Sequence, residues 1–291
     1  MSECQIIQGD CIESMAGLDP ESVHCCITSP PYWGLRDYRV DGQIGLEETP
    51  DEYVSKMVDV FRAVRRVLRD NGTLWLNLGD SYAGTGTNGL KTKDLVGIPW
   101  RVAFALQADG WYLRQDIIWH KPNPMPESVK DRCTKAHEYV FLLSKSAKYY
   151  YDHEAIKETA VGGRPGNKTH KGKTAYEQGD EKMRTKAGLT KIGAVTKRNK
   201  RSVWTVSPRP FVDAHFAVFP PALIEPCILA GCPEGGTVLD PFGGSGTTAE
   251  VAIKHKRNAI LCELNPEYVG MAEGRVEGVV EASGFLEGEY T

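Results

Sequence analysis

The stretch "GGTVLDPFGGSGTTAEVAIKHKRNAILCELNPEY", residues 235–268, constrains the fold more than any other part of the chain. Its pattern predicts a buried strand, a glycine-rich turn, a helix and a second strand. Two parallel strands need a crossover connection of this kind, because a hairpin would make them antiparallel. The stretch therefore predicts a βαβ unit, which belongs to a parallel sheet covered by helices.

Strands and helices also alternate through the first half of the chain. The hydrophobic periodicity predicts strands at 24–28, 73–80, 112–121 and 137–146 and helices at 51–70 and 99–110, with Asn71-Gly72 as the stop of the first helix and a glycine-rich loop at 81–89. Alternation of this kind predicts an α/β fold with a mostly parallel sheet and helices on both faces.

The segment 157–201 breaks the alternation. It contains 13 Lys and Arg against four Asp and Glu, a net charge of +9, which leaves −12 for the rest because the whole chain carries −3. Apolar residues are sparse there. The composition fits a solvated, partly disordered loop or an insert that faces nucleic acid, and the sequence alone does not separate the two. Its basic residues are densest at Lys197, Arg198, Lys200 and Arg201.

Other features argue against metal binding, secretion and membrane insertion. The eight cysteines form no C-x2-C pair, which predicts buried, reduced thiols in a cytosolic protein and no metal site. Cys227, which follows Pro226 in the apolar stretch 222–231, is interpreted as a core residue of a helix. The N-terminus shows no secretory signal, and charged residues and prolines interrupt the most apolar window, so no membrane span is expected.

The glycine-rich turn and the strand that follows it suit a nucleoside ligand. Gly243, Gly244 and Gly246 let the backbone approach a ligand and direct helix N-terminal N–H groups at it. Glu263, 17 residues after Gly246, ends the next strand, where an acid can accept both ribose hydroxyls of an adenosine-containing cofactor. Each feature alone also fits a plain tight turn or a solvated acid, but together they favour a nucleoside site.

A second unusual stretch is "CCITSPPYWGLRDY", residues 25–38. An apolar strand stops at Thr28-Ser29, two prolines then fix the backbone and remove two N–H donors, and two large aromatic residues follow. The chain therefore ends a buried strand in a rigid turn followed by aromatic side chains, which a plain turn does not require.

These two stretches resemble the motifs of a known family. "DPFGGSGTT" resembles the S-adenosylmethionine-binding motif of DNA methyltransferases that modify exocyclic amino groups, and "TSPPY" resembles their catalytic motif. The catalytic motif comes first and the basic segment lies between, as in the β group of that family, whose Rossmann-like fold is circularly permuted. The segments "IIQGDCIESM", "IIWHKPNP" and "HFAVFPPALIEPCI" also lie where the β group has them.

The resemblance implies a role for individual residues and S-adenosyl-L-methionine as the cofactor. It divides the chain into a catalytic half at 1–156, a basic target-recognition insert at 157–203 and a cofactor-binding half at 204–291. Trp119 is either a wall of the base site or a core residue, and His215 is assigned no role. The implied catalytic residues are Ser29, Pro30, Pro31 and Tyr32; the implied cofactor residues are Asp10, Phe219, Pro220, Asp240, Phe242, Gly243, Gly244, Gly246, Thr247 and Glu263; the implied DNA contacts are Lys197, Arg198, Lys200 and Arg201.

The activity that the resemblance implies is methyl transfer to a flipped base in double-stranded DNA, in the cytoplasm of a prokaryotic or phage-infected cell. Family members with Ser at the first motif position mostly modify N4 of cytosine, and N6 of adenine is the alternative. A methyltransferase acting on RNA or protein is disfavoured by the motif order, and a DNA-binding module without activity leaves both ligand motifs unexplained. A homodimer and a cognate restriction enzyme remain open.

Overall fold

The structure is a computed structural model that describes residues 2–87, 89–160, 196–208 and 219–288. The chain forms two compact units, one made of residues 1–152 with 202–291 and the other of residues 153–201. The larger unit holds both stretches that the sequence singles out as ligand motifs. Most of the basic segment, residues 161–195, and His215 lie outside the described residues.

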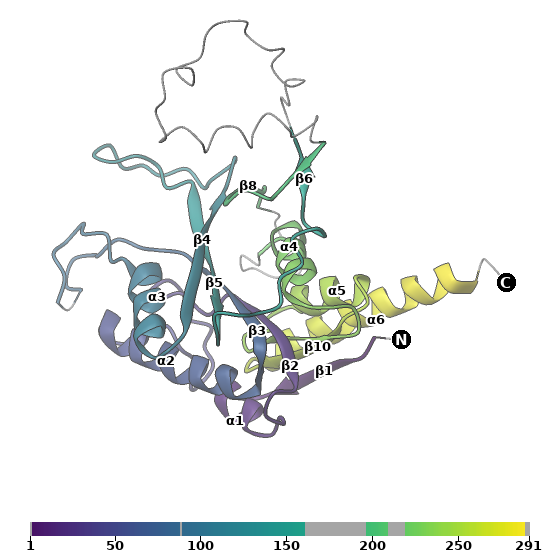
Figure 1. Cartoon of the computed structure of the whole chain (residues 1–291). Coiled ribbons are helices and arrows are strands. Elements are labelled where there is room, and N and C mark those ends of the chain that lie inside the picture. Colours follow the sequence, from purple (N-terminus) through teal and green to yellow (C-terminus); the bar gives the residue numbers. More distant parts are fainter. Residues whose placement is uncertain (1, 88, 161–195, 209–218, 289–291) are drawn as a thin grey trace, which may run out of the picture. The chain divides into compact units, whose positions relative to one another are not determined.

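One sheet of eight strands runs through the described part of the larger unit. In chain order its strands are β1 (Cys4–Gln8), β2 (Val23–Thr28), β3 (Leu68–Leu78), β4 (Tyr112–His120), β5 (His137–Ser144), β8 (Val203–Thr205), β9 (Thr237–Asp240) and β10 (Asn258–Glu263). Across the sheet the order is β1, β10, β9, β2, β3, β5, β4, β8 (Figure 1). Of these described strands, β5 alone runs antiparallel to its neighbours, so the prediction of a mostly parallel sheet is confirmed.

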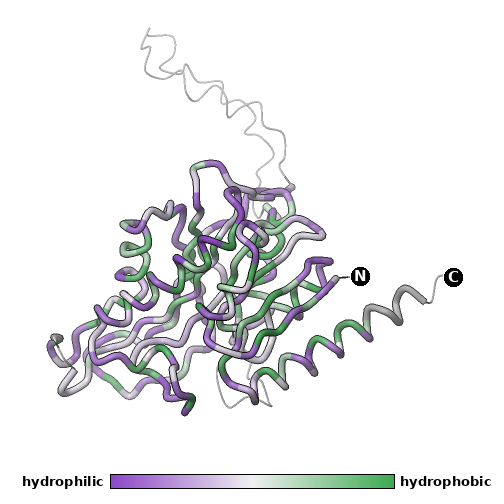
Figure 2. The backbone as a smooth tube through the Cα atoms, turned by 90° about the horizontal axis from the view of Figure 1, so that it is seen from below, coloured by the Kyte–Doolittle hydropathy of each residue, from purple (hydrophilic) through white to green (hydrophobic). Residues whose placement is uncertain are grey.

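Helices cover both faces of this sheet, as the alternation predicts. They are α1 (Cys11–Ala16), α2 (Pro50–Val67), α3 (Ile98–Ala108), α4 (Pro221–Gly231), α5 (Thr247–Lys254) and α6 (Pro266–Gly288). Helices α1 to α3 pack on one another, and α4 to α6 form a second group (Figure 1). Figure 2 shows hydrophobic and hydrophilic residues alternating along α6. Buried apolar side chains come from the strands of the sheet and from the helices that cover it. The apolar core therefore lies between the sheet and its two helical layers.

Helix α2 ends earlier than the sequence predicts. The expected stop at Asn71-Gly72 is wrong, because the helix ends at Val67 and β3 begins at once with Leu68. Leu68 is fully buried and pairs with Val23 of β2. A Cβ on Gly72 would lie 2.9 Å from a carbonyl oxygen of β2, so this glycine permits close approach of strands rather than ending a helix. Pairing within the sheet outweighs the local helix signal.

The strand order of the sheet reverses between β9 and β2, which makes this position a topological switch point. From β9 the chain continues outward to β10, whereas from β2 it continues to β3 on the opposite side. Strands β9 and β2 are parallel neighbours, so their carboxyl ends lie at the same edge of the sheet. In open α/β sheets, ligands bind outside the carboxyl ends of the strands at such a switch point. The glycine-rich turn follows β9, and the Ser29-Pro30-Pro31-Tyr32 motif follows β2.

The smaller unit contains one short antiparallel pair among its described residues. Strand β6 (Glu158–Thr159) pairs with β7 (Lys197–Arg198). Both Arg198 and Arg201 donate from Nε to Glu158 Oε1, at 2.8 and 2.6 Å. The unit overlaps the range that the sequence sets apart as an insert, and two of its four densest basic residues already share a carboxylate.

Two further expectations concern cysteines and membranes. All eight cysteines are free thiols, and six of them are buried, including Cys227 in α4. The expectation of buried thiols is wrong for Cys133, which is exposed in the loop between β4 and β5, where the chain leaves the sheet. In the part of the chain that the structure describes, the helices lack the length and apolarity needed to cross a bilayer.

Candidate active site

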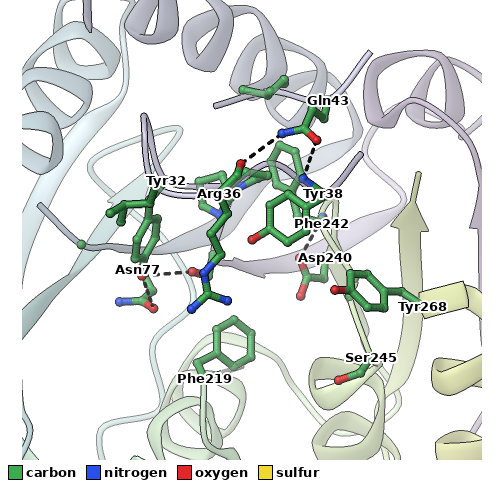
Figure 3. Close-up of a pocket in the computed structure, with 18 of the residues that line it drawn as sticks. Tyr32, Arg36, Tyr38, Gln43, Asn77, Phe219, Asp240, Phe242, Ser245 and Tyr268 are labelled. Carbon is green, nitrogen blue, oxygen red and sulfur yellow. Dashed lines mark hydrogen bonds between the residues drawn. The ribbon is translucent and has the colours of Figure 1, made fainter. Parts of the chain in front are cut away.

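A cavity of about 590 Å³ opens at the carboxyl ends of β9 and β2. Residues from both ligand motifs line it, so the fold brings together segments more than 200 positions apart in the chain. Figure 3 shows Asp240 and Phe242 on one side of the cavity and Tyr32 and Asn77 on the other. The predicted residues that line it are Asp10, Ser29, Pro30, Pro31, Tyr32, Phe219, Asp240, Phe242, Gly243, Gly244, Thr247 and Glu263, together with Trp119.

Close packing against β10 and α6 determines the shape of the glycine-rich turn. A Cβ on Gly243 would lie 2.8 Å from Leu261 Cβ on β10, and a Cβ on Gly246 would lie 2.9 Å from Ala272 Cα on α6. Gly244 and Gly246 also have positive φ angles of 50° and 84°, which favour glycine. Gly246 does not line the cavity, so its role is to let α5 pack on α6. The turn can then present its backbone N–H groups at the cavity.

Asp240 ties the two motifs together. Its carboxylate accepts hydrogen bonds from the Thr28 hydroxyl at 2.6 Å, the Thr248 hydroxyl at 2.6 Å and the Phe242 N–H at 3.0 Å. Thr28 is the last residue of β2, and Thr248 lies in the first turn of α5. Burial raises the pKa of Asp240 to about 6, against the opposing effect of these hydrogen bonds. Asp240 therefore positions the turn and the end of β2 from inside the protein.

Glu263 lies where the sequence predicts a ribose acceptor. Its Oε2 accepts from the Gly244 N–H at 2.7 Å and its Oε1 from the Asn265 N–H at 2.8 Å. Burial raises its pKa above the usual value. A carboxylate has about four lone-pair sites, so both oxygens retain capacity for ligand hydroxyls. Asp10 lines the same cavity and caps α1 by accepting from the N–H groups of Ile12 and Glu13.

Ser245 is a cavity residue that the sequence reasoning did not name. Its hydroxyl is buried and has no hydrogen-bond partner among the described residues, although the residue lines the cavity (Figure 3). A buried polar atom without a partner is costly unless a ligand or water satisfies it. Its place inside "DPFGGSGTT" was the available signal. The unsatisfied hydroxyl, the glycine turn and Glu263 together fit a polar, nucleoside-containing cofactor.

The Ser29-Pro30-Pro31-Tyr32 motif is held rigidly at the end of β2. The Tyr53 hydroxyl donates to the Pro31 carbonyl at 2.8 Å. The Tyr32 hydroxyl lies 2.8 Å from Glu138 Oε2 and 3.2 Å from Asn77 Oδ1, and the Ser29 hydroxyl lies 3.3 Å from it. Burial and the negative charge of Glu138 raise the pKa of Tyr32 well above its usual value. The phenol therefore stays neutral and serves as a hydrogen-bond donor.

Glu138 connects this motif to a cation. Lys121 forms an ion pair with Glu138, and both side chains are largely buried. The Lys121 ammonium also lies 4.2 Å from the centroid of the Trp119 ring. Sequence reasoning missed Glu138 and Asn77. The available signal for Asn77 was a single polar residue inside the apolar run "LWLNL".

Tyr32 depends on a glycine at the end of β3. A Cβ on Gly79 would lie only 2.5 Å from Tyr32 Cε2, well inside contact distance. The ring therefore packs directly over the Gly79 backbone. Any larger residue there would displace the aromatic face that borders the cavity.

The segment after the motif contributes a further group of cavity residues that the sequence reasoning did not assign. Gln43 bridges this segment, because its Oε1 accepts from the Tyr38 N–H at 2.7 Å and its Nε2 donates to the Arg36 carbonyl at 3.2 Å (Figure 3). The Tyr38 ring meets the Tyr268 ring edge to face, with centroids 6.4 Å apart. The loop therefore borders the cavity from the motif side to the start of α6.

Pro220 is a predicted cofactor residue that does not line the cavity. Pro220 caps α4 and is buried beside Phe219, which does line the cavity. The four basic residues predicted to contact DNA belong to the smaller unit or its boundary, as described above.

Comparison with known proteins agrees with the fold and the motifs. A family model described as DNA methylase, for N6 and N4 methyltransferases, matches residues 23–274. The chain is 48% identical over 297 residues to the Type II methyltransferase M.SmaI of Serratia marcescens, covering 95% of this chain and 91% of that protein.

Two solved structures share the fold. The PvuII DNA methyltransferase, described as cytosine-N4-specific, aligns with a TM-score of 0.69 at 21% identity, over 97% of this chain and 91% of that one. A DNA modification methylase of Thermus thermophilus, in complex with S-adenosyl-L-methionine, aligns with a TM-score of 0.62 at 25% identity, over 96% of both chains. Motif order, fold and family match agree, and the chain belongs to the S-adenosylmethionine-dependent N4/N6 family of DNA methyltransferases.

Proposed function

We propose that the protein methylates N4 of cytosine at a specific site in double-stranded DNA, using a base flipped out of the duplex. One observation carries the proposal: a single cavity is lined both by the glycine-rich turn with Glu263 and by Ser29-Pro30-Pro31-Tyr32. A methyl donor held at the first set of residues would lie beside a base held at the second. Direct transfer between two bound groups requires this arrangement.

The cofactor side is suited to hold S-adenosyl-L-methionine, which supplies an electrophilic methyl group on a sulfonium when bound. Glu263 would accept the ribose hydroxyls, because it is fixed by two backbone N–H groups and retains lone pairs. Ser245 would gain the partner that its buried hydroxyl lacks among the described residues. Phe219 and Thr247, which both line the cavity, would close the methionine end.

The base side is suited to an exocyclic amino group. The lone pair of such a nitrogen is delocalised into the base, which makes it a poor nucleophile. Acceptance of its two hydrogens by the Ser29 hydroxyl and the Pro30 carbonyl would favour a pyramidal nitrogen with an available lone pair. The Pro31 carbonyl is already engaged by Tyr53, which helps to keep the neighbouring Pro30 in place. Tyr32 would stack on the flipped base.

The choice of cytosine rests on Ser29 at the first position of the motif, which among the family favours cytosine N4. The PvuII enzyme, which shares the fold, is described as cytosine-N4-specific and agrees with this choice. Adenine N6 is the alternative product of the same cavity, because both bases carry an exocyclic amino group on a flat ring.

Chromatography of nucleosides coupled to mass analysis tests the proposal directly, because N4-methylcytosine and 5-methylcytosine have the same mass and are distinguished by their retention times. The purified protein, duplex DNA and S-adenosyl-L-methionine are incubated, and the DNA is digested and analysed. We expect N4-methylcytosine in samples with the wild-type chain and a large loss of it with Ser29→Ala, whose DNA affinity should change little because the lost interaction strengthens in the transition state. N6-methyladenine would reject the choice of base, and 5-methylcytosine would reject the amino-group mechanism.

Further proposals concern partners. We assign Lys197, Arg198, Lys200 and Arg201 to phosphate contacts, for which Arg198 and Arg201 would exchange their shared carboxylate for the DNA backbone. The related M.SmaI is a Type II methyltransferase, which supports a role beside a cognate restriction enzyme in the cytoplasm of a prokaryotic cell. A homodimer remains open.

A further inference from the structure

The loop between β4 and β5, residues 121–136, borders the cavity beside the base motif, Ser29-Pro30-Pro31-Tyr32. Pro124, Met125, Pro126 and Glu127 all line the cavity together with Ser29 and Tyr32. The loop contains four Lys and Arg residues against two Asp and Glu residues, a net charge of +2, whereas the residues outside 157–201 together carry −12. A basic loop at the rim of the base site is well placed to lie along a DNA duplex whose base has entered the cavity.

Met125 is the most exposed large hydrophobic residue of the described chain, with 86% of its surface accessible. Single exposed apolar residues are common on protein surfaces, so exposure alone means little. Met125, however, stands at the rim of a cavity and between Pro124 and Pro126, which fix the backbone on both sides of it. Its side chain is therefore carried on a stiff support and projects into solvent beside the base motif.

The loop is also fastened to the body of the larger unit. The Arg132 guanidinium lies 3.7 Å from the centroid of the Tyr82 ring and forms an ion pair with Glu127. Lys135 Nζ donates to the Asp80 carbonyl at 2.8 Å. Asp80 and Tyr82 closely follow Gly79, on which the Tyr32 ring packs. The loop 121–136 and Tyr32 of the base motif therefore both contact the stretch of chain that follows β3.

We infer that Met125 is an intercalating wedge, which enters the DNA stack at the space that the flipped base leaves. The inference rests on the proposed function, because it requires a base that leaves a duplex. Proteins that open base steps often insert Met, Leu, Phe or Pro between the bases. A flipped base leaves an apolar gap whose filling offsets part of the unstacking cost. Met125 is an apolar side chain of suitable size at the mouth through which that base enters.

The test compares Met125→Ala, Met125→Leu and the control Val129→Ala on two DNA duplexes. Val129 is exposed on the same loop but does not line the cavity. One duplex contains the normally paired target cytosine, and in the other an abasic site faces the target, so that no base pair needs to be broken. On the paired duplex, we expect Met125→Ala to lower kcat/KM about tenfold, because its wedge is lost, while Met125→Leu and Val129→Ala stay within about twofold of wild type.

The unpaired duplex separates a wedge from a general defect. Met125→Ala should stay within about twofold of wild type there, because little base pairing opposes flipping. Wild-type rates on the paired duplex would overturn the inference, and so would an equal loss on both duplexes, which would indicate damage to the loop or the base site. Thermal melting and cofactor affinity of each variant check that the fold is intact. If the wild-type chain methylates neither duplex, the proposed function falls and the wedge falls with it.

Discussion

The two sides of the cavity are built in different ways. On the cofactor side, the residues from Asp240 to Glu263 come from one continuous βαβ unit. Glycines shape its turn, and the carboxylates of Asp240 and Glu263 accept hydrogen bonds from backbone N–H groups of that turn. On the base side, Tyr32, Asn77, Lys121 and Glu138 come from the ends of four different strands or their loops. Their contacts are between side chains, and they include a largely buried ion pair.

This difference predicts different responses to mutation. A ligand held by backbone N–H groups and one acid should lose affinity when the acid is removed, while the base side keeps its shape. An aromatic face held by side chains from distant strands should lose its position when any support moves. Cofactor affinity and turnover should therefore respond to separate substitutions, and the following experiments test that separation, beginning with the largest expected effect.

Gly79→Ala should disable the base side. The added Cβ would lie 2.5 Å from Tyr32 Cε2, so the ring must move. A displacement of about 1 Å at a reacting group can lower kcat about 100-fold. Cofactor affinity, measured by calorimetry, should stay close to wild type.

Gly84→Ala is the matched control for that variant. Gly84 is exposed on the same loop, and its added Cβ would meet only Thr87 Oγ1 at an ordinary 3.9 Å. Turnover of this variant should match wild type. Normal kcat in a folded Gly79→Ala protein would show that the position of the Tyr32 ring does not limit methyl transfer.

Glu263→Ala should act on the cofactor side alone. The substitution removes the charge-assisted hydrogen bonds to the ribose, worth about 1.5–3 kcal/mol. It also removes the acceptor of the Gly244 N–H. The cofactor Kd should therefore rise at least about tenfold. Calorimetry on the DNA-free protein measures this rise. The exposed Glu267, a few residues on, is the control, and Glu267→Ala should bind normally. Unchanged affinity in Glu263→Ala would remove ribose binding from its role.

Asp240 lies at the junction of the two sides, and its response to pH gives the smallest expected effect. Its pKa of about 6 in the folded chain exceeds the usual carboxyl value, so the folded state binds the proton more tightly than the unfolded state. Stability contributed by this group therefore rises as pH falls toward and through 6. Between about pH 7 and about pH 5, wild type should gain about 1 kcal/mol relative to Asp240→Asn, which does not titrate.

Urea unfolding of both proteins at the two pH values measures that gain. The quantity of interest is the change in the difference between the two proteins, so a large but constant destabilisation by Asn does not affect the result. A difference that stays constant with pH would mean that Asp240 remains ionised in the folded chain throughout this range.

The sequence by itself determined the central part of the fold and the position of the cofactor side. A strand, a glycine-rich turn, a helix and a second strand within about 30 residues leave few arrangements, because parallel strands need a helical crossover and a short turn needs residues that tolerate positive φ. Gly244 and Gly246 have such angles, and Glu263 ends β10 beside the turn. The abrupt end of β2 at Ser29 was likewise visible in the residues themselves.

Only the tertiary structure decided what surrounds the base motif. Strand β5 is antiparallel to β3, and this register sets the Asn77 amide 3.0 Å from the Tyr139 carbonyl and brings the neighbouring Glu138 to the Tyr32 hydroxyl. Strand pairing between distant segments depends on the packing of both faces of the sheet, so a local pattern does not specify it. Gly72 illustrates the same limit, because a local helix stop became part of a strand once Leu68 was buried against β2. Local backbone requirements are written in neighbouring residues, whereas a site assembled from side chains of separate strands exists only after those strands have paired.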